Sequence, residues 1–186
     1  ILFMDADGSD DPDDASEILK PILAGTADLV IGSRSLGQAD PGAMTPPQRF
    51  GNWLAPALIR LIWGARFTDL GPFRAVRRDH FEALVMQDRD FGWTVEMQVR
   101  AAKLGMTVLE VPVAYRRRIG VSKISGTLMG VIGAGSKIIH VILREALCDY
   151  GADASLPPAA GRNDGDGARR GHMSSAGVSH LAGAVR

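Results

Sequence analysis

The chain has 186 residues, of which 46% are hydrophobic and 23% are charged. These proportions exclude a disordered or fibrous chain and are typical of one globular domain with a sizeable core. The 21 Lys and Arg residues balance the 21 Asp and Glu residues, so no overall positive field favours nucleic acid as a partner. The single cysteine, Cys148, excludes an internal disulfide and fits a reducing compartment.

The two ends of the chain differ in character. The chain begins with neither an initiator Met nor a signal-peptide pattern, and its first residues resemble the end of a buried strand, so we expect further sequence upstream of Ile1. No apolar run reaches the ~18 residues of a membrane span. Residues 151–186 contain 7 Gly and 8 Ala with few large apolar side chains, which predicts a disordered tail over 150–186.

The first half of the chain alternates strand and helix signals. The apolar run Ile1–Met4 predicts a buried parallel strand whose carboxyl end carries acids. Asp11 followed by Pro12 predicts a helix start, and Pro21 predicts a kink or an end of that helix near residue 20. Residues 27–34 predict a second strand, followed by a long Gly/Pro-rich loop to residue 47.

The second half continues the alternation. Apolar residues predict a helix over 50–63 and an amphipathic helix over 94–104, while Asp79 and Glu82 form a capping-box pattern for a helix to about residue 86. Residues 106–115 predict a strand at a sheet edge, because Pro112 cannot donate a hydrogen bond. The order of elements predicts an α/β fold with a mixed, mostly parallel sheet flanked by helices.

An acidic cluster follows the first strand. From Asp5 to Glu17 there are seven carboxylates and no Lys or Arg. Asp5 and Asp7 are spaced to share a hard divalent cation, Mg²⁺ or Mn²⁺, at the carboxyl edge of a sheet. A solvated acidic turn is the alternative, and we favour it for the remaining aspartates, Asp10, Asp11, Asp13 and Asp14. An EF-hand loop does not fit the spacing.

Several motifs occur in one order along residues 1 to about 143: "DADGSDDP", "DLVIGSR", "QRFGNWL", "TDLGPFRAVRRD", "FGWTVEMQ" and "VPVAYRRRIGVSKISG". In this combination the chain resembles family 2 glycosyltransferases, and among them the polyprenyl-phosphate sugar transferases of the dolichyl-phosphate mannosyltransferase kind. The resemblance implies a GT-A fold. Residues 1–122 would form part of the catalytic domain, with its nucleotide-binding half upstream.

The resemblance also implies roles for individual residues. Asp5 and Asp7 correspond to the metal-linked pair on the donor diphosphate, with Ser9 at a position where relatives often have Gln. Asp69 corresponds to the sugar-side acid and Glu96 to an acid at the reaction centre. The residues implied in substrate binding are Arg34 and Arg49 near the phosphates, Arg74 beside Asp69, and Trp93 against the sugar or the acceptor.

Ordinary structural roles compete with several of these assignments. Arg49 is equally well interpreted as a surface arginine, and Asp69 can cap a turn. Glu96 stands four residues before Arg100, which is the spacing of an ion pair on a helix face.

The segment "YRRRIGVSK" offers guanidinium groups, an ammonium group and a glycine-containing loop to a phosphate. By resemblance it is the loop that binds the acceptor phosphate, through Arg116, Arg118, Ser122 and Lys123. A solvated basic turn is the alternative. A nucleic-acid site is less favoured, because the segment lacks interleaved aromatic residues beyond Tyr115.

Residues 123–149 form an amphipathic pattern with a basic edge at Lys137 and Arg144. This pattern suits a membrane-proximal helix in the headgroup region, at the cytoplasmic face of a membrane, peripheral or anchored. The glycines Gly130, Gly133 and Gly135 weaken the helix and leave a packed hairpin as the alternative.

The functional hypothesis is metal-dependent transfer of a sugar from a nucleotide-diphosphate sugar to a polyprenyl phosphate, with inversion at the anomeric carbon. Two alternatives remain open. The acceptor could be a hydroxyl group of a sugar or small molecule, for which Asp69 or Glu96 would be the base. The chain could also be a noncatalytic membrane-associated or metal-binding fragment.

Overall fold

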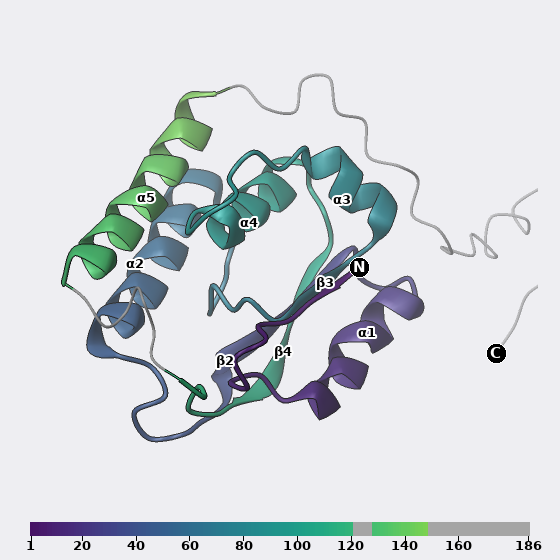
Figure 1. Cartoon of the computed structure of the whole chain (residues 1–186). Coiled ribbons are helices and arrows are strands. Elements are labelled where there is room, and N and C mark those ends of the chain that lie inside the picture. Colours follow the sequence, from purple (N-terminus) through teal and green to yellow (C-terminus); the bar gives the residue numbers. More distant parts are fainter. Residues whose placement is uncertain (121–127, 149–186) are drawn as a thin grey trace, which may run out of the picture.

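The structure is a computed structural model that describes residues 1–120 and 128–148 (Figure 1). The described part is an α/β domain, which confirms the predicted class. Its strands are β1 (Leu2–Phe3), β2 (Leu29–Ala39), β3 (Arg74–Val76) and β4 (Val108–Tyr115), and its helices are the 3-10 helix η1 (Pro12–Asp14), α1 (Ala15–Leu23), α2 (Pro46–Trp63), α3 (Arg78–Leu84), α4 (Trp93–Lys103) and α5 (Leu128–Leu147).

The four described strands form one mixed sheet in the order β1-β3-β2-β4. β2 and β4 are parallel, whereas β3 is antiparallel to both β1 and β2. The expectation of a mostly parallel sheet is therefore wrong for the described strands, since β1 meets β3 rather than a parallel neighbour. β4 lies at the edge, as Pro112 predicted.

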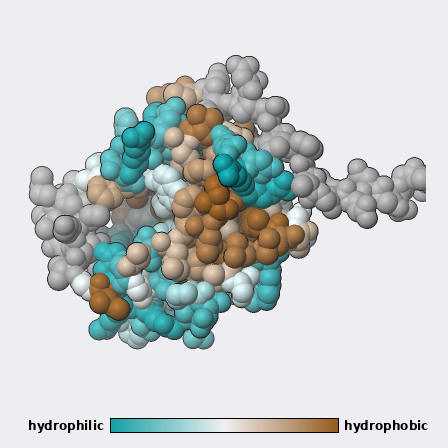
Figure 2. All heavy atoms as spheres, turned by 45° about the vertical axis from the view of Figure 1, so that its right-hand side comes forward, coloured by the Kyte–Doolittle hydropathy of each residue, from teal (hydrophilic) through white to brown (hydrophobic). Residues whose placement is uncertain are grey.

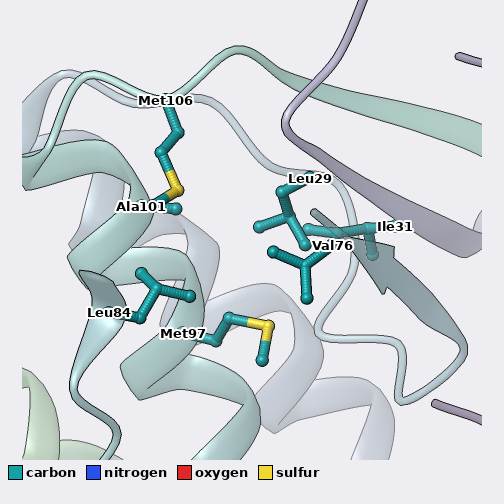
Figure 3. Packing of buried hydrophobic residues seen from close by; sticks show 7 residues of the cluster. All are labelled: Leu29, Ile31, Val76, Leu84, Met97, Ala101 and Met106. Atoms are coloured by element: carbon teal, nitrogen blue, oxygen red, sulfur yellow. The ribbon is translucent and has the colours of Figure 1, made fainter. Parts of the chain in front are cut away.

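Alternating side chains of the sheet build two cores. Val30 and Ala75 face α1 and pack around the fully buried Ile18. Leu29 and Ile31 point to the other face, toward α4, and meet Met97 there (Figure 3). This period of two is the pattern of a strand covered on both faces, and the helices lie on both sides of the sheet (Figure 1).

A third core lies away from the sheet, where α2, α4 and α5 meet. α5 runs beside α2 (Figure 1) and buries Val141 and Ile142 against Ile59 and Val99. α5 covers most of the segment 123–149 that was predicted to be membrane-proximal. Part of the apolar face of α5 therefore packs on the domain. Within residues 1–120 and 128–148, no helix is both long enough and apolar enough to cross a bilayer.

Three local predictions are wrong. α1 continues through Pro21 to residue 23, so the predicted end near residue 20 is wrong, while the kink offered beside it stays a prediction; the buried Ile18 holds the helix against the sheet. β2 extends across residues 35–39, which were predicted as a loop, because it regains its pairing with β4 after a register shift. Arg77 is the N-cap of α3 without a side-chain capping bond, since Asp79 binds Arg77 and His80 instead of forming a capping box.

Candidate functional site

The acidic turn after β1 is fixed by its own hydrogen bonds. Oδ1 of Asp7 accepts from the amide of Ser9 at 3.0 Å and from its hydroxyl at 2.5 Å. Gly8 adopts φ of 76°, a left-handed conformation that favours glycine. The turn therefore points one edge of the Asp7 carboxylate inward and leaves Oδ2 for another partner.

That partner is Arg118 of the basic segment after β4. Its Nε donates to Oδ2 of Asp7 at 2.8 Å, and Nη2 donates to the same oxygen. The amide of Ile119 donates to the carbonyl oxygen of Asp7 at 2.8 Å. Burial alone would raise the pKa of the Asp7 carboxyl, but the bonds from Ser9 and Arg118 outweigh it and lower that pKa. The acidic turn and the basic segment thus lie in direct contact.

The neighbouring arginines hold the basic segment in place. The amide of Arg116 donates to the carbonyl oxygen of Ser9 at 2.8 Å, and its guanidinium pairs with Asp11. Arg117 was not singled out in the sequence; its Nη2 donates to the carbonyl oxygen of Pro41 at 2.6 Å and ties the segment to the turn after β2. Ser122 and Lys123 lie outside the described residues.

Asp10 departs from its predicted role as a solvated acid. Its side chain is only 4% exposed, and Oδ2 accepts from the amide of Asp5 at 3.0 Å. Oδ1 is buried and has no hydrogen-bond partner in the described part of the chain. Burial raises the pKa of Asp10 to about 6, although the Asp5 amide opposes this. Nothing in the sequence separates Asp10 from Asp11, Asp13 and Asp14, none of which is buried.

The acidic turn fits a hard divalent cation. Burial and the charge of Asp7 raise the pKa of Asp5, so a cation near both carboxylates would relieve their repulsion. The orphaned oxygen of Asp10 adds negative potential nearby. Among the described residues, no three His, Cys, Asp or Glu side chains converge as a complete metal cage. Two carboxylates suffice for Mg²⁺ or Mn²⁺ when water and phosphate oxygens complete the shell.

Asp69 and Arg34, which lies in the middle of β2, form a second charged pair. Nη2 of Arg34 donates to Oδ1 of Asp69 at 2.6 Å, and Nε donates to Oδ2 at 2.9 Å. Asp69 is fully buried. Burial would lower the pKa of Arg34, but the Asp69 carboxylate outweighs it and raises that pKa. Glu110 fixes the turn below by accepting from the amides of Thr68 and Asp69 at 2.9 and 3.3 Å.

Polar residues that the sequence analysis did not select hold the Asp69 turn. Oδ1 of Asn52 accepts from the amide of Leu70 at 2.7 Å, and Nε2 of Gln98 donates to the carbonyl oxygen of Asp69 at 2.7 Å. A Cβ atom added at Gly71 would lie 2.3 Å from the carbonyl oxygen of Gly32, so the turn approaches β2 as only glycine permits. The sequence did contain a signal for Asn52: its polar amide stands at a position of α2 where the apolar pattern predicts a side chain that faces the core.

Arg74 lies beneath this turn rather than in an open site. It is fully buried, and its guanidinium donates to the carbonyl oxygens of Gly71 at 3.0 Å, Leu70 at 3.1 Å and Thr94 at 3.0 Å. Burial lowers the pKa of Arg74 to about 9. The structure therefore gives Arg74 contacts that support the backbone near Asp69.

Trp93 lines a cavity of about 690 Å³ together with Asp5 and Pro72. Its ring packs edge-on against Phe3, with centroids 4.7 Å apart, so it is anchored on one side. Apolar side chains gather on the face that carries the amino terminus (Figure 2). Leu2, Met4 and Phe91 are exposed apolar side chains that line this cavity.

Glu96 lies in a buried ion network between α4 and α5. Its carboxylate is 3.0 Å from Nη2 of Arg100 and accepts from Nη2 of Arg144 at 2.5 Å. It also accepts from the amides of Gln87 and Asp88 at 3.0 and 2.8 Å. The structure thus contains the helix-face ion pair that the sequence left as the alternative, and the Glu96 carboxylate is held by two arginines and two backbone amides.

Two further hollows border α2 and contain arginines. One, of about 190 Å³, lies between α2 and α5 and is lined by Arg34, Asn52 and Ile138 among others. The other, of about 390 Å³, is lined by Arg49, Trp53 and Thr68 among others. Arg49 is exposed at this rim, so the structure is compatible with both of its predicted roles.

Paired aspartates follow strand β1 of this α/β domain, and Arg118 from the segment after β4 contacts one of them. Residues 1–85 match the family model described as "Glycosyl transferase family 2". The domain therefore belongs to this glycosyltransferase family, as its motifs predicted. No solved structure matches the chain.

Curated relatives agree with this family. The undecaprenyl-phosphate mannosyltransferase of Micrococcus luteus is 33% identical over 135 residues, which are 70% of this chain and 55% of that protein. The polyprenol monophosphomannose synthase of Mycolicibacterium smegmatis is 33% identical over 141 residues, 68% of this chain and 49% of that protein. Glycosyltransferase AglJ of Haloferax volcanii is 36% identical over 119 residues, which are 63% of this chain and 39% of that protein. The chain spans about half the length of these relatives.

Proposed function

We propose that this chain takes part in the transfer of a hexose from a nucleotide-diphosphate sugar to a polyprenyl phosphate, with inversion at the anomeric carbon. The contact between Arg118 and Asp7 carries the proposal, because it joins the acids suited to a donor diphosphate to the arginines suited to an acceptor phosphate. Two relatives are named for transfer of mannose to a polyprenyl phosphate, which supports this acceptor class and makes mannose the first sugar to test.

On the donor side, Asp5 and Asp7 would hold Mg²⁺ or Mn²⁺. Such an ion supplies positive charge to a departing diphosphate. The surrounding residues keep the two carboxylates oriented: the Ser9 hydroxyl and amide fix Asp7, and Asp10 holds the amide of Asp5. This rigidity favours one arrangement of the negative charges before the donor arrives.

On the acceptor side, the phosphate needs orientation rather than a general base, because it is already anionic near neutral pH. Arg118 and Arg116 border the acidic turn and can donate to phosphate oxygens, and we assign Ser122 and Lys123 to the same cradle. Arg49 would extend it along the rim of α2.

Asp69 would face the sugar as a fixed acid. Arg34 binds both of its oxygens, and Arg74 binds the carbonyl oxygens of its turn, so these arginines position Asp69. Trp93 would contact the sugar or the acceptor from the cavity next to Asp5. We assign Glu96 a structural role, because its carboxylate is held by Arg100, Arg144 and two backbone amides.

A polyprenyl acceptor resides in a bilayer, so we also propose that the domain works at a membrane surface, on the cytoplasmic face. No nucleic-acid partner is proposed, because the chain has no net positive charge.

The test is an assay with Mn²⁺ or Mg²⁺, a short-chain polyprenyl phosphate and a panel of nucleotide-diphosphate hexoses that begins with the mannose donor. Mass spectrometry should detect a prenyl-phosphate hexose. Transfer to hydroxyl acceptors instead would favour the second enzymatic hypothesis. Calorimetry that finds neither Mn²⁺ nor nucleoside diphosphate bound would favour a noncatalytic fragment.

A further inference from the structure

The basic edge of helix α5 contacts the domain. Lys137 and Arg144 are seven residues apart, so they lie on the same edge of the helix. Nζ of Lys137 is 3.0 Å from Oδ2 of Asp88. Nη2 of Arg144 donates to Oε1 of Glu96 at 2.5 Å. Both acids are buried, whereas both cations are partly exposed. The edge that the sequence pattern assigned to a headgroup region therefore binds carboxylates of the domain.

Asp88 also organises the segment between α3 and α4, here named loop 85–92. Its Oδ1 accepts from the amides of Asp90 at 2.9 Å and Gly92 at 3.2 Å. Burial alone would raise the pKa of Asp88, but Lys137 and these amides outweigh it and lower that pKa. Because loop 85–92 contains neither helix nor strand, its shape depends on side-chain bonds of this kind.

Loop 85–92 and α5 approach each other as closely as glycine permits. A Cβ atom added at Gly92 would lie 2.5 Å from Cγ2 of Val141 on α5 and 2.8 Å from Oδ2 of Asp88. Val141 is itself fully buried in the core that α5 shares with α4. A larger residue at position 92 would therefore push the loop and α5 apart, so packing and the ion pair both fix this contact.

Loop 85–92 also forms one wall of the cavity of about 690 Å³ beside Asp5. Its residues that line the cavity are Arg89, Asp90 and Phe91. Trp93 lines the same cavity and begins α4 directly after the loop. The amide of Trp93 donates to the carbonyl oxygen of Asp90 at 3.2 Å. The loop thus connects the ion pair on α5 with the cavity that Trp93 and Asp5 share.

We propose that Lys137 is a positioning residue, which through Asp88 holds loop 85–92 in the arrangement that shapes the cavity beside Asp5. With the ion pair intact, the loop keeps one arrangement and Trp93 presents its ring to the cavity. Without Lys137, Asp88 is a buried carboxylate that has lost its cation, and the loop samples further arrangements. The proposal rests on the proposed function in one respect, because the cavity wall affects transfer only where the hexose of a donor enters.

The experiment is fluorine NMR of the 186-residue chain labelled with fluorotryptophan, in which Trp53, Trp63 and Trp93 each give one signal. Trp93→Phe assigns the signal that reports on the cavity wall. Lys137→Gln should increase the line width of this signal about twofold, because the loop then exchanges between arrangements. The signal of Trp63, which packs in the core shared by α2, α4 and α5, should stay unchanged. A role confined to anchoring α5 would instead move both signals.

Three further variants test the mechanism. Lys137→Arg keeps the charge and should give the wild-type Trp93 signal. Asp88→Asn should broaden that signal as Lys137→Gln does, and the double variant should add nothing, as expected of two residues that act as a pair. Lys20→Gln is the matched control, because it removes a lysine from an ion pair with Glu17 on α1, outside the cavity lining.

Calorimetry with Mn²⁺ present gives a second readout. A nucleotide-diphosphate hexose should bind Lys137→Gln about fivefold more weakly, because a smaller fraction of the protein has the binding-competent wall. Nucleoside diphosphate without the sugar should bind both proteins within about twofold, since the wall would contact the hexose. This difference also excludes a general effect of the lost positive charge, which would weaken both ligands.

Any of four results would overturn the proposal: an unchanged Trp93 signal in Lys137→Gln, an equal change of the Trp63 signal, a Lys137→Arg variant that behaves like Lys137→Gln, or a wild-type donor affinity that Lys137→Gln leaves intact. The NMR readout needs no substrate, so the two proposals can fail separately. If the positioning proposal alone fails, Lys137→Gln uses the donor as the wild-type chain does. If the proposed function alone fails, no hexose is transferred, while Trp93 still responds to Lys137→Gln.

Discussion

Arg118 and Asp7, which are 111 residues apart in the chain, share two hydrogen bonds to a single carboxylate oxygen. The contact joins the segment after the last strand to the turn after the first. Each group therefore already has a partner that resembles the ligand we assign to it: Asp7 binds a cation, the Arg118 guanidinium, and Arg118 binds an oxyanion, the Asp7 carboxylate.

Replacing Arg118 by Ala should weaken the use of a prenyl phosphate by about 10- to 100-fold, the effect of losing a charge-assisted hydrogen bond. Binding of nucleoside diphosphate should fall much less. Arg117→Ala is the control, because Arg117 binds the carbonyl oxygen of Pro41 and does not contact Asp7. The measurement is calorimetry with each ligand in turn, and an equal loss for both ligands would count against the assignment.

Asp10 should make the domain less stable as the pH rises. Its carboxyl has a pKa of about 6 in the folded protein against 3.8 ordinarily, so between about pH 4 and 6 the folded state binds more protons than the unfolded state. The free energy of unfolding should fall across that window and then level off. Asp10→Asn should remove this dependence and raise the Tm at pH 7, measured with a chelator present. Asp13→Asn, an exposed neighbour, should leave the pH profile intact.

Glu96→Gln should cost about 1 to 3 kcal/mol of unfolding free energy, because Arg100 and Arg144 would lose a buried carboxylate while both keep Glu145 as a partner. Urea denaturation measures the effect. The control is Glu82→Gln, which breaks an exposed pair with Arg78 on α3 and should change stability by less than about 1 kcal/mol. A fully stable Glu96→Gln variant with lost sugar transfer would instead revive the catalytic assignment.

Asp69→Asn should weaken both stability and function. The variant leaves the mostly buried Arg34 without its carboxylate, which costs about 3 kcal/mol or more. The control is Asp79→Asn, whose pair with Arg77 is more exposed. Thermal melting and donor binding should both respond to Asp69→Asn. If melting responded alone, Asp69 would be a structural residue only.

Local signals in the sequence predicted much of the fold. Gly64 and Gly105 end the helices that precede them, each with a positive φ, and Pro112 marked the edge strand. These features depend on backbone conformation within a few residues, so the sequence encodes them directly. The extension of β2 was not predictable in this way, because it depends on pairing with β4 more than seventy residues later.

The motifs in the sequence predicted which residues of the candidate site lie together, but not how deeply those residues are buried. The order of motifs brought Asp7 and Arg118 into one hypothesis, and the structure places them in contact. Burial could not be predicted in the same way. Asp10 looks like a solvated acid in the sequence, and only tertiary packing shows its orphaned oxygen. The spacing of Glu96 predicted its pair with Arg100, but not its second arginine partner, Arg144.

The most direct test of the central claim, that the acidic turn and the arginine segment are two halves of one site, is the coupling between Mn²⁺ and a short-chain prenyl phosphate in calorimetry. Each ligand should tighten the other by about tenfold, equally in both directions. Asp7→Asn should abolish the coupling, since Arg118 contacts that carboxylate and the proposed ion would share it. Independent binding of the two ligands in the wild-type chain would contradict the account.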